Sequence, residues 1–179
     1  MPSKASGARD FRIEVSINLS VDELVRPDLV AFPDQLLNEY RVPAYTTVLE
    51  VTESKLVDDV NTVLAGLTRL RLEGFGLSID DFGTGFSTME QLRRFPFSEL
   101  KIDRAFVNGA HRRASAKAIF QSSVNLANAL NIVSVAEGVE DDADLDLAVE
   151  LGTHLIQGYH IAKPMSAIDL ERWFEGRGH

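Results

Sequence analysis

Four apolar segments of this chain end in carboxylates, the oxygen ligands that hard divalent cations prefer. The segments occupy residues 48–53, 77–81, 100–103 and 132–137, and their acids include Glu50, Asp80, Asp81, Asp103 and Glu137. In a parallel α/β barrel the strand ends of one polarity meet at one face, so acids that are far apart in the sequence converge there. The pattern therefore predicts a site for a hard cation at that face.

These residues also have ordinary structural interpretations. An adjacent pair such as Asp80-Asp81 is more often a solvated turn or a helix cap, and an isolated Lys101 would be a surface residue in most proteins. Glu50 is harder to explain in this way, because it lies inside an apolar run that we expect to be buried. A buried acid needs a partner, and a metal ion would supply one.

The composition is that of one globular domain, with 179 residues of which 45% are hydrophobic and 25% are charged. The formal net charge of −9 argues against binding to DNA or RNA polymers, because such binding relies on Lys and Arg to displace counterions. An anionic ligand would need a bound metal or a local basic group. The absence of cysteine excludes disulfides and thiolate catalysis, and it fits the cytoplasmic location that we expect.

The sequence carries no sign of membrane insertion. No apolar stretch approaches the roughly 20 residues that a transmembrane helix needs, and the first residues lack an apolar signal core. We expect residues 1–10 to be a linker, a tag remnant or a ragged start, and residues 11–179 to form the folded domain.

Strand-like and helix-like segments alternate along the folded region. The spacing predicts strands at residues 11–19, 48–51, 76–79, 100–102, 132–135 and 154–157. Helices are predicted at residues 57–73, 89–95, 114–130, 143–151 and 167–174, and at 21–40 with breaks at Pro27 and Pro33. Strands that alternate with helices pair in parallel through right-handed crossovers. The predicted fold is α/β, an incomplete TIM-type barrel with about six of the eight strands of a closed barrel.

Several motifs in this order resemble one known family. The most specific is Asp80-Asp81-Phe82-Gly83-Thr84-Gly85-Phe86-Ser87, followed by Lys101-Ile102-Asp103-Arg104. The others are Glu50-Val51-Thr52-Glu53-Ser54, Ala136-Glu137-Gly138-Val139-Glu140 and Gln157-Gly158-Tyr159. Together they resemble the EAL domain, the bacterial phosphodiesterase family that opens cyclic di-GMP.

The resemblance implies a two-metal site. Asn18, Glu50, Asp80 and Asp81 match the family positions that bind two divalent cations, and Asp103 is a further candidate for the second metal or its water. Oxygen ligands of this kind suit Mg²⁺ or Mn²⁺. On a regular strand, neighbouring side chains point to opposite faces, so both aspartates can face metal only if the strand ends there.

The resemblance also implies catalytic and supporting residues. Lys101 matches the family lysine near the attacking water, and Glu137 matches the carboxylate proposed as general base or metal ligand. Substrate contacts are implied for Glu140 and Gln157. The family loop that links metal binding to dimerisation is anchored by residues that match Glu53, Gly83, Thr84 and Gly85.

The Glu-Ala-Leu motif that names the family is absent from this sequence. In the family, that motif lies at the end of the second barrel strand, and its glutamate is a metal ligand. The resemblance therefore implies a domain that lacks its first two strands and one ligand, with activity reduced or lost. It also implies exposed barrel edges, from which we expect a homo-oligomer.

Three functions follow from the resemblance. The first is hydrolysis of cyclic di-GMP to linear pGpG by a two-metal mechanism. The second is a catalytically impaired module that still binds cyclic di-GMP, and the third is an interaction fragment that recruits a partner through strand edges. The presence of all six main site residues favours the first: Asn18, Glu50, Asp80, Asp81, Lys101 and Glu137.

Other features are interpreted as structural. Gly83 and Gly85 form only half of a nucleotide-binding glycine fingerprint. The four histidines have no shared metal-ligand spacing, so we expect surface or packing positions for them. We expect a solvated helix N-terminus for the acidic run of Asp141, Asp142, Asp144 and Asp146.

Overall fold

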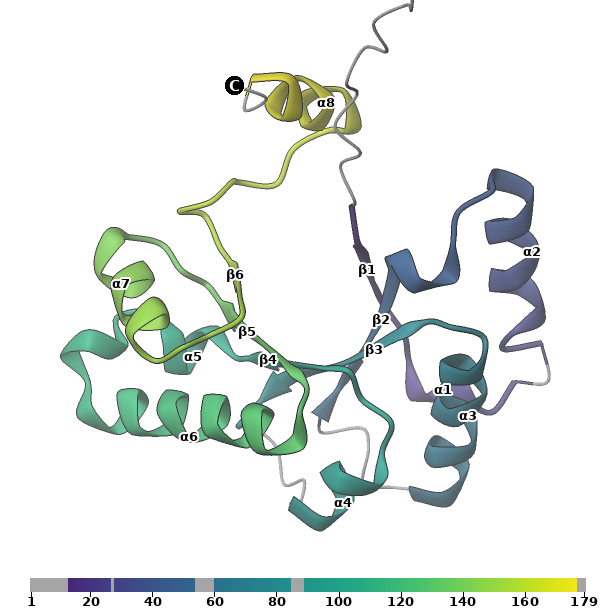
Figure 1. Cartoon of the computed structure of the whole chain (residues 1–179), viewed down its shortest axis with the longest axis horizontal. Helices are drawn as coiled ribbons and strands as arrows, with labels where there is room; N and C mark the ends of the chain where they lie inside the picture. The colour runs from purple at the N-terminus through teal and green to yellow at the C-terminus, as the bar shows by residue number, and fades with distance from the viewer. Residues whose placement is uncertain (1–12, 27, 54–59, 85–88, 177–179) are drawn as a thin grey trace, which may run out of the picture. The chain divides into compact units, whose positions relative to one another are not determined.

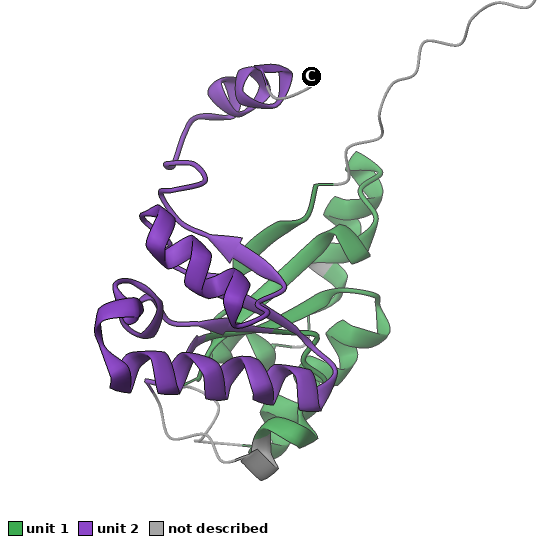
Figure 2. Ribbon diagram, turned by 60° about the vertical axis from the view of Figure 1, so that its left-hand side comes forward, with its two compact units in different colours: residues 1–80, 85–99 green, residues 81–84, 100–179 purple. Residues whose placement is uncertain are grey.

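The computed structural model describes residues 13–26, 28–53, 60–84 and 89–176. The described strands number six and follow the order β1-β2-β3-β4-β5-β6, with helices between them (Figure 1). This β-α succession is that of an incomplete TIM-type barrel, as the sequence predicts. The chain divides into two compact units, residues 1–80 with 85–99 and residues 81–84 with 100–179, which Figure 2 colours separately.

Unit 1 holds the first strands and their helices. Its described elements are β1 (Val15–Asn18), α1 (Val21–Leu24), α2 (Ala31–Tyr40), a 3₁₀ turn (Ala44–Thr46), β2 (Thr47–Thr52), α3 (Val60–Leu72), most of β3 (Gly76–Phe82) and α4 (Met89–Arg94). β2 pairs in parallel with both β1 and β3. Parallel pairing between strands joined by helices is the arrangement that the alternation predicts.

Helix α3 supplies much of the apolar packing in unit 1. Val63, Leu67 and Leu70 recur at helical spacing, and each is at most 1% exposed. Gly66 lies on the same helix, where a Cβ would approach the carbonyl oxygen of Leu24 to 2.8 Å. The missing side chain therefore lets α1 pack directly against α3.

Pro33 does not break the helix that contains it, contrary to the prediction. It is the third residue of α2, which runs without interruption to Tyr40. A proline is tolerated in the first turn, because the backbone N–H that it lacks would have no intrahelical partner there. The predicted break lies instead between α1 and α2.

Unit 2 holds the remaining elements. They are most of β4 (Glu99–Ile102), α5 (Arg104–Val107), a second 3₁₀ turn, η3 (Ala110–Arg112), α6 (Ala114–Leu130), β5 (Val133–Glu137), α7 (Asp142–Glu150), β6 (Leu155–Gln157) and α8 (Ala167–Gly176). Helix α6 has the predicted bounds, whereas α5 and η3 were not predicted. Helix α5 begins because the Asp103 carboxylate accepts a hydrogen bond from the backbone N–H of Ala105, at 2.8 Å.

The core of unit 2 lies between α6 and the strands. Phe120, Val124 and Ala127 of α6 are fully buried, as are Leu100 and Ile102 of β4. Their spacing of three and four residues puts one face of α6 against the sheet. None of the described helices combines the length and hydropathy that a bilayer-spanning helix needs.

Strand β1 leaves apolar side chains in solvent. Val15 is 53% exposed and Ile17 is 50% exposed, although both belong to a strand paired with β2. An exposed strand edge of this kind is a template for pairing with another chain. The homo-oligomer nevertheless stays a prediction, because nothing in the structure shows what covers this edge.

Candidate metal and catalytic site

In unit 1 the pairing register brings three polar residues side by side. Asn18 of β1 lies opposite Glu50 of β2, and Glu50 lies opposite Ser78 of β3. In a parallel sheet, residues that lie opposite one another on paired strands have their side chains on the same face. Residues two positions apart along one strand also share a face. Asp80 follows Ser78 by two positions, so Asn18, Glu50 and Asp80 belong to one face, as a shared site requires.

That face is rich in oxygen, and its burial increases from β1 inward: Asn18 is exposed, Asp80 is half-buried, and Glu50 and Ser78 are buried. Glu50 is 7% exposed, and Ser78 is fully buried. Within the described residues the Ser78 hydroxyl has no hydrogen-bond partner, which is uncommon for a buried polar atom. A hard cation among oxygen donors fits these residues, because it would compensate both the buried carboxylate and the unpaired hydroxyl. Ser78 was missed from the sequence, although its place two residues before Asp80 on a predicted strand was a usable signal.

The end of β3 departs from the prediction. The strand does not stop before Asp80 and Asp81 but continues to Phe82. Asp81 has a backbone φ of 56°, in the left-handed region that side chains other than glycine rarely adopt. This left-handed residue interrupts the alternation of side chains between the two faces of the strand. Asp81 therefore need not point to the face opposite Asp80, although the strand does not end there.

In unit 2 a buried ion pair joins two predicted catalytic residues. The Lys101 Nζ lies 2.6 Å from the Glu137 Oε1, and the two side chains are 6% and 16% exposed. Carboxylate oxygens of Asp81 and Glu137 lie within 4.8 Å of each other. The lysine thus pairs with one of two acids that are close enough to share a cation, and the donor set again suits Mg²⁺ or Mn²⁺.

Gln157 is placed next to Glu137. The two residues oppose each other in the parallel pair of β5 and β6, so their side chains share a face. The following residue, Gly158, fixes this junction, because a Cβ there would lie 2.1 Å from the carbonyl oxygen of Val139. Only glycine permits this approach between the two strand ends.

Glu140 and Asp103 have partners within unit 2. Glu140 forms an exposed ion pair with Arg104 at 3.2 Å. Asp103 caps α5 through Ala105, which leaves its second carboxylate oxygen available for another ligand. The substrate contact predicted for Glu140 and the metal contact predicted for Asp103 stay predictions.

Gly83 and Thr84 follow the end of β3 directly. Gly83 has a φ of 101°, and a Cβ there would lie 2.9 Å from the ring of Phe106. The Thr84 hydroxyl donates to the carbonyl oxygen of Asp81 at 2.8 Å, which fastens the start of the loop to the residue that bears the acid. Gly85 lies outside the described residues. Glu53 is 2% exposed, and its anchoring function stays a prediction.

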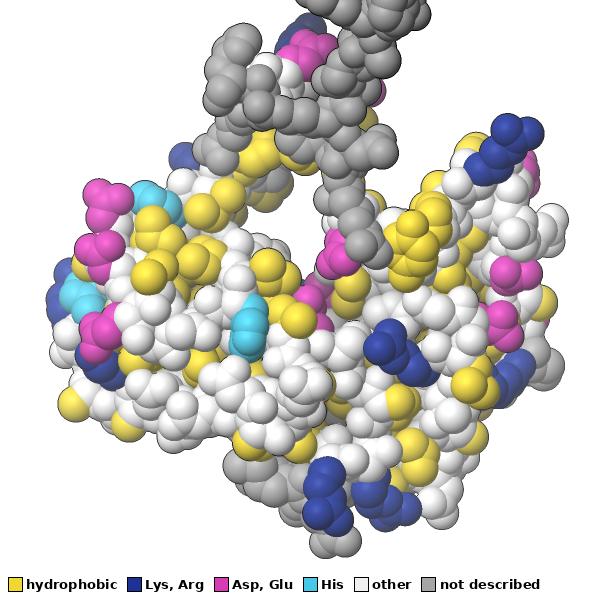
Figure 3. All heavy atoms as spheres, viewed as in Figure 1, with side chains coloured by type: hydrophobic (Ala, Val, Ile, Leu, Met, Phe, Trp, Pro, Cys, Tyr) yellow, Lys and Arg dark blue, Asp and Glu magenta, His cyan; other side chains and the backbone are white. Residues whose placement is uncertain are grey.

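The acidic run at α7 corrects one expectation. Its exposed members appear in Figure 3 among the magenta side chains gathered over α7, but Asp144 is only 1% exposed. Asp144 Oδ1 accepts a hydrogen bond of 2.8 Å from the backbone N–H of Gly109 and lies 3.4 Å from the His111 Nδ1. Asp144 is therefore a buried anchor and not a solvated residue. Successive side chains of a helix point in different directions around its axis, so one acid of the run faces inward while its neighbours face solvent.

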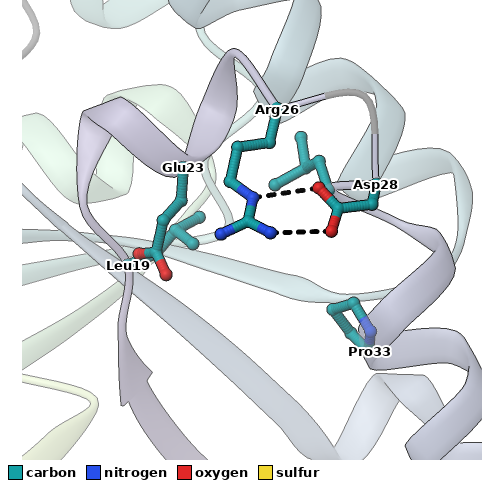
Figure 4. Close-up of a pocket in the computed structure, with 6 residues that line it drawn as sticks. Leu19, Glu23, Arg26, Asp28 and Pro33 are labelled. Atoms are coloured by element: carbon teal, nitrogen blue, oxygen red, sulfur yellow. Dashed lines mark hydrogen bonds and ion pairs between the residues drawn. The ribbon is translucent and has the colours of Figure 1, made fainter.

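Unit 1 also contains a hollow of about 290 Å³ just beyond β1, lined by Leu19, Glu23, Arg26, Asp28, Leu29 and Pro33. Figure 4 shows Arg26 and Asp28 joined by two hydrogen bonds, of 2.9 and 2.7 Å. Hydrogen bonding to Arg26 lowers the pKa of Asp28, and the same contact raises the pKa of Arg26. The charges of Arg26 and Asp28 neutralise each other, and the remaining charged group of the lining, Glu23, accepts a hydrogen bond from the backbone N–H of Ser20 at 2.8 Å.

Two curated proteins illustrate what the chain is similar to. The chain is 39% identical over 153 residues to the cyclic di-GMP phosphodiesterase RocR of Pseudomonas aeruginosa, an alignment that covers 86% of this chain and 39% of RocR. It is 31% identical over 167 residues to the cyclic di-GMP phosphodiesterase PdeR of Escherichia coli, covering 93% of this chain and 25% of PdeR. The chain thus spans well under half of these curated relatives.

Solved structures show the same fold. The PaMucR phosphodiesterase in complex with c-di-GMP superposes with a TM-score of 0.83 at 38% identity, covering 88% of this chain and 64% of that one. The EAL domain of Mycobacterium smegmatis DcpA gives a TM-score of 0.86 at 32% identity, covering 92% of this chain and 74% of the DcpA chain. Residues 3–164 match the family described as EAL domain. This chain belongs to the EAL domain family.

Proposed function

We propose that this domain hydrolyses cyclic di-GMP to the linear dinucleotide pGpG with two divalent cations. The observation that carries the proposal is the buried Lys101–Glu137 pair, at 2.6 Å, with the Asp81 carboxylate beside it. The similarity to RocR and PdeR, both cyclic di-GMP phosphodiesterases, supports the same substrate. Cyclic di-GMP is thus the proposed partner, and a cytoplasmic location stays part of the proposal.

The metal-binding part of the proposal rests on the acids of each unit. In unit 1, Asn18, Glu50 and Asp80 would hold a cation on their shared face of the sheet. In unit 2, Asp81 and Glu137 would do so, with Asp103 as a further ligand. Bound Mg²⁺ or Mn²⁺ would polarise the phosphodiester and acidify a water.

The remaining residues would contact the substrate, activate the attacking water or position the loop that follows Asp81. Lys101 supplies a positive charge that offsets the anionic phosphate, and burial strengthens this interaction because the local dielectric is low. Glu137 would accept a proton from the attacking water or bind metal, and Gln157 beside it would contact substrate. Glu140 would contact substrate as well, while Glu53, Gly83, Thr84 and Gly85 would position the loop that follows Asp81.

A second candidate function is binding without turnover. It is favoured by the ion pair itself, because Lys101 holds one oxygen of Glu137 at 2.6 Å, and metal binding or proton transfer at that oxygen requires this contact to open. A module of this kind would bind cyclic di-GMP and leave it intact.

Two assays separate the two functions. Chromatography measures hydrolysis of cyclic di-GMP incubated with the chain and Mn²⁺ or Mg²⁺, and a calorimetric titration with the same ligand measures binding. The variant is Glu50→Gln, which removes a buried charge, and the control is Glu73→Gln, which removes an exposed one. Hydrolysis that is lost in Glu50→Gln and kept in Glu73→Gln supports the enzyme. Binding without hydrolysis supports the second function, and the absence of both refutes the two together.

A further inference from the structure

Three arginines surround a hollow of about 440 Å³ in unit 2. The hollow lies over α5 and η3 and is lined by Arg104, Ala105, Asn108, Gly109, Arg112 and Arg113. It belongs to a chain with a net charge of −9, so a concentration of guanidinium groups at one place is unexpected from composition. Its volume lies within the range of small-ligand sites, about 300–1,000 Å³. We call it the arginine pocket.

Arg113 is held in place by the backbone of α5. Its guanidinium donates to the carbonyl oxygens of Ala105, at 2.9 Å, and Asn108. These carbonyls lie at the end of the helix, where they lack intrahelical partners. A guanidinium carries five N–H donors, so Arg113 keeps donors for a ligand while its position is fixed.

The floor of the arginine pocket is anchored to the core. Gly109 has a φ of 64°, and its backbone N–H donates to the buried Asp144 at 2.8 Å. A Cβ on Gly109 would lie 3.5 Å from the Arg112 Nη2, so the guanidinium of Arg112 rests beside this glycine. The turn that presents Arg112 is thus fixed from below by a buried carboxylate.

The acids near the arginine pocket are already engaged. Glu140 pairs with Arg104 at 3.2 Å, and Asp144 faces His111 at 3.4 Å and accepts from Gly109. Asp103 caps α5. Among the described residues, the Arg112 side chain makes no hydrogen bond and no ion pair of its own. One unpaired guanidinium and one anchored guanidinium therefore remain for an anion.

We propose that the arginine pocket binds a phosphate monoester. A monoester carries up to two negative charges and three terminal oxygens, which match the fork geometry of two guanidiniums. A phosphodiester has a single charge and two such oxygens, so it fits less well. Inorganic phosphate and the terminal phosphate of a nucleotide share the required chemistry. The inference does not depend on hydrolysis of cyclic di-GMP.

Calorimetric titration of the whole chain tests the proposal, with inorganic phosphate and with 5′-GMP as separate probes at low ionic strength. EDTA is present, so that no divalent cation bridges the phosphate to the acids. The variant is Arg112→Gln, and the control is Arg93→Gln, an exposed arginine of α4 in unit 1. Both variants lose one positive charge, so a general charge effect changes them equally.

We expect saturable binding to the wild type. Its affinity should fall by about tenfold or more in Arg112→Gln, because a charge-assisted hydrogen bond is lost, and should be unchanged in Arg93→Gln. The amide resonance of Gly109 should shift during the titration. Binding of 5′-GMP but not of inorganic phosphate identifies a nucleotide site, and equal binding of both identifies a phosphate site. No saturation by either probe, an equal loss in both variants, or no shift at Gly109 overturns the proposal.

Discussion

Removal of Lys101 alone should destabilise the protein far more than removal of Lys101 and Glu137 together. At the observed 2.6 Å, Coulomb's law with an effective dielectric of about 20 gives roughly 6 kcal/mol of attraction. Taking each charge out of water costs several kcal/mol, so the net contribution of the intact pair is small. A single substitution keeps the desolvation cost of the surviving charge and removes the attraction, which typically costs about 3–5 kcal/mol.

The neighbouring acid makes the two single substitutions unequal. In Lys101→Met, Glu137 and Asp81 face each other within 4.8 Å without the lysine, so we expect the upper end of that range. In Glu137→Gln no second acid is left facing an unpaired carboxylate, and the Asp81 carboxylate stays within 4.8 Å of the position of the Glu137 carboxylate, so we expect the lower end. Each single variant loses the same attraction, so their sum counts it twice, and the double variant should be more stable than that sum predicts by about the attraction itself, roughly 6 kcal/mol.

Urea denaturation with EDTA measures these free energies of unfolding, since a bound cation would replace the lysine. The control is Lys117→Met, because Lys117 pairs with Glu150 at 2.9 Å on the surface, where the side chains are 42% and 63% exposed. Solvent screening limits that pair to well under about 1 kcal/mol. The buried pair would be refuted if each single substitution at Lys101 or Glu137 lowered the free energy of unfolding by less than about 1 kcal/mol and the double variant equalled their sum.

Three further substitutions test particular contacts. Gly158→Ala should cost about 1–3 kcal/mol in thermal or urea unfolding, because its Cβ would lie 2.1 Å from the Val139 carbonyl oxygen, whereas Gly176→Ala, with no atom within 4 Å, should be close to neutral. Asp144→Ala should cost about 2–3 kcal/mol by leaving the buried N–H of Gly109 without its acceptor, and an effect as small as that of the exposed Asp146→Ala would contradict the anchor. Arg26 lowers the pKa of Asp28 below its ordinary 3.8. The wild type should therefore have a larger free energy of unfolding than Asp28→Asn above pH 3.8, and this difference should disappear as the pH falls through the lowered pKa. A difference that grows as the pH falls would contradict the assigned sign.

Regular elements of the fold were predictable from local patterns. Helix α6 spans Ala114–Leu130 as expected, because its apolar residues keep helical spacing over 17 residues. The short helix α5 was missed, because four residues carry too little periodicity to predict a helix. Pro33 was misjudged for a related reason: the effect of a proline depends on its position in the helix, and the start of α2 is set by the turn before it.

Residue types at the site were predictable, but their geometry was not. The motif around Lys101 and the motif around Glu137 lie far apart in the sequence, and no local pattern states that the two side chains meet at 2.6 Å. The pairing of Asn18 with Glu50 depends on a strand register that is set by the whole sheet. The left-handed backbone at Asp81 likewise depends on surroundings that a sequence does not display.

The acids of unit 2 illustrate how partners decide what a carboxylate does. Asp144 is buried and accepts from Gly109, Glu140 pairs with Arg104, and Asp103 caps α5, so each stabilises local structure. Glu137 differs from these, because its partner Lys101 is itself buried and carries a charge that a cation could replace. Acids held by backbone N–H groups cannot exchange their partner without unfolding a turn, whereas the Lys101–Glu137 pair can open by a side-chain rotation. Exchange of partners is what a metal-dependent reaction requires, and Glu137 is therefore the acid of unit 2 whose surroundings suit chemistry best.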